Sequence, residues 1–144
     1  MWNYEKNFGE RRNRRYGKRG SYRINSTFWL FWGCESINRL VIDKWHELYG
    51  QNIKGKVMVY PEGRGSTVGA AVVLELVRTG CAPAAIINRK IETITAAGGL
   101  MAKKFYNKDM PMVDRLSEDP IKAIKTGDIV EVNGTTGEVT IYSR

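Results

Sequence analysis

The chain has 144 residues, 23 Lys and Arg against 15 Asp and Glu, and a formal net charge of +8. A chain of this length can bury a hydrophobic core and is most simply one domain. No apolar run approaches the roughly 18 residues that a membrane span needs, and the basic N-terminus lacks the apolar core of a secretory signal. We therefore expect a cytoplasmic protein with no membrane partner.

The cysteines and the single histidine offer little metal chemistry. Cys34 and Cys81 lie far apart and form no CxxC pair, so the sequence indicates neither a zinc site nor a disulfide framework. We expect two buried or free thiols. His46 could act as a single base, but its apolar neighbours Trp45 and Leu48 favour a structural role.

The positive charge is concentrated at the N-terminus. Residues 1–23 hold eight Lys and Arg against two Glu, so they carry +6 of the total charge of +8. We expect a basic, partly ordered N-terminal extension over 1–23, with a strand only near its end, and a folded domain over 24–144. A solvated extension is favoured over an arm that binds nucleic acid.

An aromatic stretch follows this extension. Residues 22–32, YRINSTFWLFW, are rich in β-branched and aromatic types, which predicts one or two strands. The four aromatic side chains could stack on nucleic-acid bases, although a core or a partner interface is the favoured interpretation. They are Phe28, Trp29, Phe31 and Trp32.

The central stretch, 56–80, predicts a strand, a glycine-rich turn and a helix in direct succession. Residues 57–60 form a short apolar run typical of a strand buried on both faces, which Pro61 ends. Gly63 and Gly65 allow a tight turn, and Ser66 stands where a helix N-cap is expected. The following valines and Leu76 recur at helical spacing before a glycine stop at position 80.

The second half predicts further alternation of strands and helices. A strand over 84–88 completes a parallel β-α-β unit. A helix is expected over 89–102, with its last turns weakened by Gly98 and Gly99, and then a charged loop over 103–109.

A short third strand is expected over 110–113, followed by a helix that starts around Pro120 and ends at Lys125. Alternating residues over 128–133 and 138–142 predict a C-terminal hairpin. The order of elements predicts an α/β domain with mixed strand directions.

The loop GRGST, residues 63–67, invites comparison with phosphate-binding loops. It is not a Walker A motif, because no lysine precedes the Ser/Thr pair. A dinucleotide site is also disfavoured, since Asn88 and Arg89 stand where an acidic ribose ligand is expected. What remains is a helix N-terminus that offers amides, a hydroxyl and Arg64 to a carboxylate or phosphate. Ser66 is then either an activated hydroxyl or an ordinary helix cap.

Six motifs resemble the aconitase X swivel-domain family, in its archaeal phosphomevalonate dehydratase type, over about residues 24–143. They occur in the order of that family: FWG (31–33), HELYG (46–50), IKGKVMVYPEGRGSTVG (53–69), APAAIIN (82–88), PMVDR (111–115) and KTGDIVEV (125–132).

The resemblance implies a swivelling β/β/α domain that is the small subunit of a 4Fe-4S hydro-lyase and is inactive alone. A separate large subunit would hold the cluster, and this chain would bind no metal. Ser66 would be the catalytic base, and the substrate-binding positions would be Gly63, Arg64, Gly65, Thr67, Asn88 and Arg115.

The implied reaction dehydrates (R)-5-phosphomevalonate, a small phosphorylated hydroxy acid, to trans-anhydromevalonate 5-phosphate in the archaeal mevalonate pathway. Two alternatives stay open. Bacterial members of the same family dehydrate cis-3-hydroxy-L-proline, so the chain could be the small subunit of such an enzyme. A basic nucleic-acid-binding module, built on residues 1–23 and the aromatic stretch, is the disfavoured alternative from another class.

Overall fold

The computed structural model describes residues 4–6, 15–24, 47–63, 69–134 and 136–142, with the backbone alone at 4–6, 15–18 and 22. Its described elements, in chain order, are β1 (Tyr4–Lys6), β2 (Arg15–Arg23), β3 (Val57–Tyr60), α2 (Gly69–Arg78), β4 (Ala85–Asn88), α3 (Thr93–Tyr106), β5 (Met112–Leu116), α4 (Pro120–Ala123), β6 (Ile129–Asn133) and β7 (Glu138–Tyr142).

The strands form one sheet in the order β1-β5-β4-β3-β2-β6-β7. Strands β2, β3, β4 and β5 run parallel to one another, whereas β6, β7 and β1 join the two edges in antiparallel pairs. The predicted α/β architecture with a mixed sheet and a C-terminal hairpin is confirmed.

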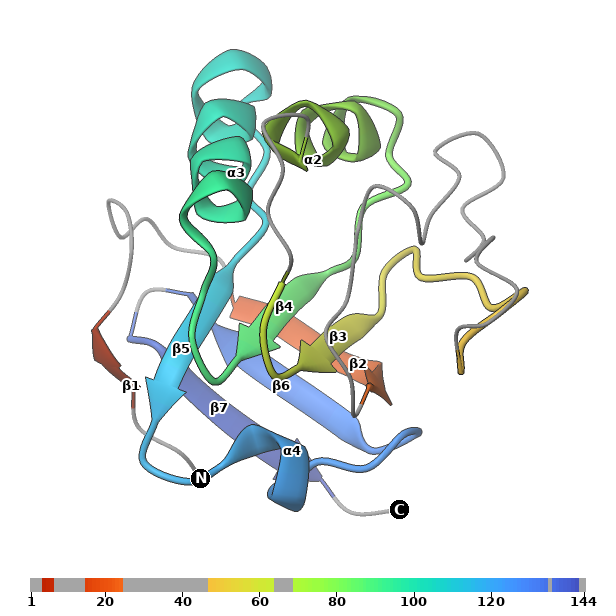
Figure 1. Ribbon diagram of the computed structural model, residues 1–144, viewed down its shortest axis with the longest axis vertical. Coiled ribbons are helices and arrows are strands. Elements are labelled where there is room, and N and C mark those ends of the chain that lie inside the picture. The colour runs from red at the N-terminus through yellow and green to blue at the C-terminus, as the bar shows by residue number, and fades with distance from the viewer. Residues whose placement is uncertain (1–3, 7–14, 25–46, 64–68, 135, 143–144) are drawn as a thin grey trace.

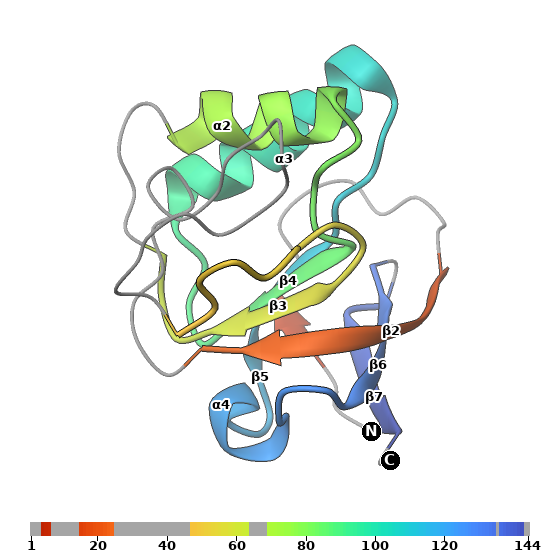
Figure 2. The ribbon, with the colours of Figure 1, turned by 90° about the vertical axis from the view of Figure 1, so that its right-hand side faces the viewer.

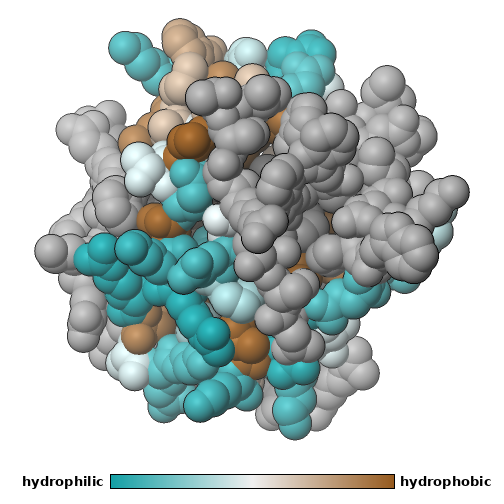
Figure 3. Space-filling model, viewed as in Figure 1, coloured by the Kyte–Doolittle hydropathy of each residue, from teal (hydrophilic) through white to brown (hydrophobic). Residues whose placement is uncertain are grey.

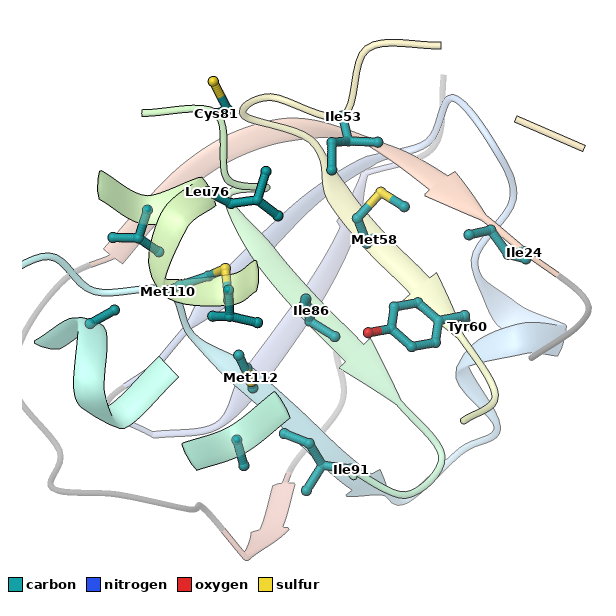
Figure 4. Packing of buried hydrophobic residues seen from close by; sticks show 14 of the residues in the cluster. Ile24, Ile53, Met58, Tyr60, Leu76, Cys81, Ile86, Ile91, Met110 and Met112 are labelled. Atoms are coloured by element: carbon teal, nitrogen blue, oxygen red, sulfur yellow. The ribbon is translucent and has the colours of Figure 1, made fainter. Parts of the chain in front are cut away.

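The sheet separates two hydrophobic layers (Figures 1 and 2). Helices α2 and α3 pack against each other over one face, and Met58, Tyr60 and Ile86 point into that layer (Figure 4). On the other face, α4 and the hairpin cover a layer that includes Val59 and Ile87. Both faces of β3 and β4 are therefore buried, as their continuous apolar runs predict.

Strands β3 and β4 have nearly the predicted bounds. All four residues of each strand are buried. Tyr60 pairs with Asn88 across the two strands, and Ile87 pairs with Val113 of β5. Gly80, which follows helix α2, has a positive φ of 70°, as expected of a glycine that ends a helix.

Strand β2 lies inside the segment that we expected to be an N-terminal extension. It pairs with β3 on one side and with β6 on the other, so residues 15–23 contribute to the centre of the sheet. Ser21 is buried, and its hydroxyl lies within hydrogen-bond distance of the Lys125 and Asp128 carbonyl oxygens, to either of which its one proton can be donated. The strand expected near the end of the extension is thus present. Of the aromatic stretch, only residues 22–24 lie within the described part of the chain.

Helix α3 differs from the predicted helix over 89–102. It starts at Thr93 and continues through Gly98 and Gly99 to Tyr106, so the predicted loop over 103–109 is wrong for its first four residues. The glycines do not weaken the helix because they allow close packing. A methyl group on Gly98 would lie 2.9 Å from the Ala70 carbonyl oxygen of α2. Tertiary contact here overrides helix propensity.

The remaining elements agree with prediction apart from their ends. Strand β5 starts two residues later than predicted and continues to Leu116. Helix α4 is capped by Asp119 and has Pro120 in its first turn, but it stops at Ala123 because Ile124 turns to an extended conformation and is fully buried. The hairpin of β6 and β7 has the predicted position, with Val130 and Val132 buried in alternation.

Candidate functional site

Three neighbouring parallel strands carry polar or aromatic side chains on one face of the sheet, at the last residues of β3 and β4 and at the third residue of β5. Tyr60 of β3 pairs with Asn88 of β4, and the register that joins Ile86 to Met112 places Asp114 of β5 next in the row. All three are at most 2% exposed. Ligands of open α/β sheets bind at the carboxyl ends of parallel strands. This row therefore forms the base of the candidate site.

Asn88 joins the ends of β3 and β4. Its Nδ2 donates a hydrogen bond of 2.9 Å to the carbonyl oxygen of Tyr60. The next residue, Arg89, donates its amide to the carbonyl of Pro61, and the Arg115 amide donates to the carbonyl of Arg89. Asn88 thus has a structural partner here, and these hydrogen bonds connect the carboxyl ends of β3, β4 and β5.

The centre of the predicted site lies outside the described residues. This holds for Arg64, Gly65, Ser66 and Thr67, so their predicted roles stay predictions. Of the loop itself, the structure describes Gly63 and Gly69, the residues on either side of 64–68. Asn88 and Arg115, predicted to bind substrate, both lie at the carboxyl ends of their strands.

Both described ends of this loop lie against the first turn of α3. A methyl group on Gly63 would be 3.7 Å from Glu92 Cβ and 3.9 Å from Thr95 Oγ1. One on Gly69 would be 3.8 Å from Ile94 Cγ2. A methyl group added to either glycine would therefore come into van der Waals range of the first turn of α3.

Glu92 occupies the N-terminus of α3. Its carboxylate accepts hydrogen bonds from the amides of Ile94 at 2.7 Å and Thr95 at 2.8 Å, and from the Thr95 hydroxyl at 3.0 Å. These free amides would otherwise attract an external anion. Sequence reasoning missed Glu92, although an acid directly before the Thr-Ile-Thr start of a helix is a capping signal.

Asp114 is a buried carboxylate with incomplete hydrogen bonding. Its Oδ2 accepts from the Ile91 amide at 3.0 Å, and Arg115 Nε lies 3.7 Å from the same oxygen. Its Oδ1 is buried and has no hydrogen-bond partner among the described residues. Burying a carboxylate oxygen without a donor is costly, and such atoms in native structures call for an explanation. Through its hydrogen bond from the Ile91 amide, Asp114 fixes the turn between β4 and Glu92.

Arg115 and Arg89 differ in how their guanidinium groups are held. Arg89 makes a bidentate pair with Asp119, at 2.7 and 2.9 Å. The Arg115 side chain is 44% exposed, and its guanidinium makes no hydrogen bond within the described part of the chain. Hydrophilic side chains gather over the ends of β4 and β5 (Figure 3). Of these two arginines, Arg115 is therefore the one whose guanidinium is available to a carboxylate or phosphate.

The Arg89–Asp119 pair predicts a pH dependence of stability. The hydrogen bond from Arg89 lowers the pKa of Asp119 below its usual value of 3.8. Because the folded-state pKa is the lower one, this contribution is present above about pH 4 and is lost as the pH falls through the folded-state pKa. Asp119→Asn should therefore lower the free energy of unfolding, measured by urea titration, more at pH 6 than at pH 3.

The matched control for this prediction is Glu118→Gln, which removes one exposed negative charge from the preceding residue. It should change the free energy of unfolding by similar small amounts at both pH values. A difference between Asp119→Asn and the wild type that is independent of pH would contradict the stabilising role of the ion pair. The effect should be modest because the Arg89 side chain is 48% exposed.

The described residues give no metal site and no membrane helix. Among them, no group of three or more His, Cys, Asp and Glu side chains could hold a metal ion. Cys81 is buried and free, as predicted, whereas Cys34 and His46 lie outside the described residues. No helix in the described ranges is both long and apolar enough to cross a membrane. The carboxyl edge thus offers anion binding and hydrogen bonding, with no metal chemistry from its described side chains.

Comparisons with known proteins agree with this geometry. The aconitase X swivel domain family matches residues 20–141. The crystal structure of Thermococcus kodakaraensis aconitase X in its holo-form has a TM-score of 0.72 and 34% identity, over 92% of this chain and 98% of that chain. A solution NMR structure of a UPF0107 protein has a TM-score of 0.73 and 34% identity, over 90% and 96%.

Many similar curated proteins are named phosphomevalonate dehydratase small subunit. The phosphomevalonate dehydratase small subunit of Methanocella arvoryzae is 48% identical over 70% of this chain and 72% of its own length. The small subunit of the same name from Methanosarcina acetivorans is 42% identical over 71% and 67%. The family match covers β3, β4, β5, both helices over the sheet, the end of β2 and all but the last residue of the hairpin. The chain therefore belongs to the aconitase X swivel domain family.

Proposed function

We propose that this chain is the small subunit of a phosphomevalonate dehydratase. The observation that carries the proposal is that relatives of this name are 37–48% identical to it. The substrate is (R)-5-phosphomevalonate, which loses water to give trans-anhydromevalonate 5-phosphate. A small subunit acts with a large one, so the complete enzyme is a heteromer.

Ser66 is the base of the proposed reaction. Ser66 Oγ, in its alkoxide form, takes the proton from the carbon next to the substrate carboxylate, and the electron pair of that C–H bond forms the C=C bond. The C–O bond to the hydroxyl on the next carbon breaks, and the departing hydroxide takes up a proton from solvent to become water. Two features support this role. The loop that contains Ser66 leaves the carboxyl end of β3, where ligands of parallel sheets bind. The N-terminus of the neighbouring α3 is already filled by Glu92, so it does not compete for the substrate anion.

Arg115 is proposed to hold one of the two anionic groups of the substrate. Its guanidinium is exposed at the same edge and has donors that no described residue uses. Arg64, Gly65 and Thr67 are proposed to bind the substrate through the loop, together with Gly63. Asn88 contributes by holding the ends of β3 and β4 together.

The large subunit is proposed to hold a 4Fe-4S cluster. When bound there, the cluster supplies an iron that acts as a Lewis acid towards a hydroxyl. The described residues of this chain do not form a site for it, because they contain no suitable group of ligands. What this chain contributes is the base and the anion-binding side chains.

The test is reconstitution of both subunits under anaerobic conditions, with the consumption of phosphomevalonate followed by phosphorus NMR. We expect dehydration only when both subunits are present. The same preparation is assayed with cis-3-hydroxy-L-proline, the substrate of the alternative dehydratase. Turnover of hydroxyproline with no turnover of phosphomevalonate would show that the proposed substrate is wrong.

No described feature favours the nucleic-acid alternative. Arg15–Arg23, a large part of the basic segment, forms strand β2 between β3 and β6 and is not a free arm. Binding of nucleic acid through phosphate contacts would weaken steeply as the salt concentration rises. A filter-binding titration of the isolated chain at two salt concentrations distinguishes this alternative from a hydro-lyase subunit.

A further inference from the structure

We propose that Asp114 is a positioning residue for Arg115, which keeps the two terminal nitrogens of that guanidinium available to an anionic group of the substrate. The two residues are neighbours near the end of β5. The inference rests on the proposed function, because the orientation of Arg115 matters to activity only if Arg115 binds the substrate. No contact between Asp114 and the substrate is proposed.

The local structure does not require a charge at Asp114. The residue is 1% exposed, and its Oδ2 accepts a hydrogen bond from the Ile91 amide. The oxygen of an asparagine side chain could accept the same hydrogen bond. Oδ1 has no hydrogen-bond partner among the described residues. Burying a carboxylate in this way is therefore costly unless a positive charge close to it offsets the lost hydration.

Arg115 supplies that positive charge. Its Nε lies 3.7 Å from Asp114 Oδ2. Successive side chains of a strand point to opposite faces, so regular β geometry would direct Arg115 away from Asp114. Arg115 instead has a φ of 53°, in the left-handed region that residues other than glycine rarely adopt.

The strained conformation of Arg115 is held by the backbone around it. The Arg115 amide donates to the carbonyl oxygen of Arg89 at 3.2 Å, which ties the end of β5 to the end of β4. Backbone strain of this kind persists only where the surrounding structure enforces it, and it is concentrated at binding and catalytic sites. Here the strain accompanies the close approach of the Arg115 guanidinium to the buried carboxylate.

The approach at Nε decides which nitrogens of Arg115 remain for a ligand. A guanidinium binds a carboxylate or phosphate most strongly through two parallel N–H groups. Asp114 lies beside Nε, and no described residue hydrogen-bonds the two terminal nitrogens. The buried carboxylate thus restrains a side chain that is otherwise 44% exposed, and leaves its terminal pair free of described partners. Restraint before binding lowers the entropic cost of binding the anion.

The experiment measures the steady-state kinetics of the reconstituted heteromer with phosphomevalonate. Asp114→Asn keeps an acceptor for the Ile91 amide and removes the charge. KM should therefore rise by about threefold to thirtyfold while kcat stays within about threefold of the wild type.

Asp128→Asn is the matched control for Asp114→Asn. The Asp128 carboxylate also accepts one backbone amide, that of Lys125, at 2.8 Å. In the described ranges, it forms no ion pair with an arginine. KM and kcat per folded molecule should both stay within about twofold of the wild type.

A double-mutant cycle separates positioning through Arg115 from a merely structural role. Arg115→Ala should raise KM by about tenfold to a hundredfold, because it removes charge-assisted hydrogen bonds to the substrate. Adding Asp114→Asn to Arg115→Ala should then raise KM by less than about twofold, since no guanidinium is left to hold. A structural role of Asp114 predicts the same rise in KM with and without the Arg115 side chain.

A second measurement does not depend on activity. In NMR spectra of the full chain, the Nε–H resonance of Arg115, assigned with Arg115→Lys, should have an order parameter above about 0.6. This resonance should move, and its order parameter should fall, in Asp114→Asn, whereas neither should change in Asp128→Asn. If the wild-type heteromer fails to dehydrate phosphomevalonate, the proposed function is wrong, and the Arg115 resonance still tests the positioning role.

Any of three results would overturn the inference. The first is a KM of Asp114→Asn within about twofold of that of Asp128→Asn. The second is an equal rise in KM with and without the Arg115 side chain, and the third is an Arg115 Nε–H order parameter that Asp114→Asn leaves unchanged.

A further variant covers the case in which Asp114→Asn does not fold. Asp114→Ser then replaces it, because the smaller hydroxyl side chain can also accept a hydrogen bond from the Ile91 amide. If neither variant folds, the order parameter of the wild-type Arg115 Nε–H decides. A value below about 0.6 would show that the guanidinium is not held.

Discussion

Replacing Ser66 by alanine should lower kcat of the reconstituted dehydratase by about a hundredfold or more, because a positioned general base contributes roughly 10²–10⁴ to the rate. KM should change little, since in the proposed binding mode the substrate anion is held by Arg115 and the loop and not by the Ser66 hydroxyl. The measurement is steady-state dehydration of phosphomevalonate by the complex, with the iron content of both preparations matched. Wild-type activity in Ser66→Ala would show that another group is the base.

The control for this variant is Ser117→Ala, which removes an exposed hydroxyl from the connection between β5 and α4. Its kcat should equal that of the wild type. Loss of an N-cap serine costs about 1 kcal/mol of stability, so a helix-capping role alone predicts a small change in the free energy of unfolding with kcat preserved. A fall in kcat therefore indicates that Ser66 is the base, whereas a fall in the free energy of unfolding with kcat preserved indicates that it is only a helix cap.

Gly98→Ala should lower the free energy of unfolding by about 1–3 kcal/mol, because the added methyl group would force two helices apart. That methyl group would lie 2.8 Å from Val73 Cβ and 2.9 Å from the Ala70 carbonyl oxygen. These atoms belong to the body of α2 and cannot move independently. The gain from replacing glycine in a helix, up to about 1 kcal/mol, offsets only part of the loss.

Gly99→Ala is the matched control, because it changes the neighbouring glycine of the same helix. Its methyl group would meet mainly Met112 Cε, at 2.9 Å, which is the flexible end of a side chain. The free energy of unfolding should therefore stay equal or rise by up to about 1 kcal/mol. Urea titrations of both full-length variants test the pair, and equal effects of the two substitutions would contradict close packing of α2 on α3.

The elements that sequence reasoning predicted well carry local signals. Strand β3 has a continuous apolar run that stops at Pro61, and the hairpin has alternating residues on both sides of a glycine turn. Helix α4 has Asp119 and Pro120 at its start. In each case the chemistry of a few neighbouring residues determines the local conformation.

The bounds of α3 could not be predicted in this way. Gly98 and Gly99 predict a weak helix end when they are considered by local propensity alone. The role of Gly98 depends on Ala70 and Val73, which precede it by about 25 residues and pack against it in the folded chain, and Gly99 lies against Met112 of β5. A contact between distant segments has no signature within a short window of sequence.

Some features of the candidate site were likewise evident in the sequence, whereas others required the tertiary structure. The motif around Ser66, the strand that precedes it and the family were evident in the sequence, since they depend on residues that are adjacent in the chain. Only the tertiary structure showed that Glu92 fills the N-terminus of α3 and lies against Gly63, and that Asp114 holds the turn before it. The parallel sheet brings the ends of β3, β4 and β5 to one edge, and that proximity decides which side chains act together.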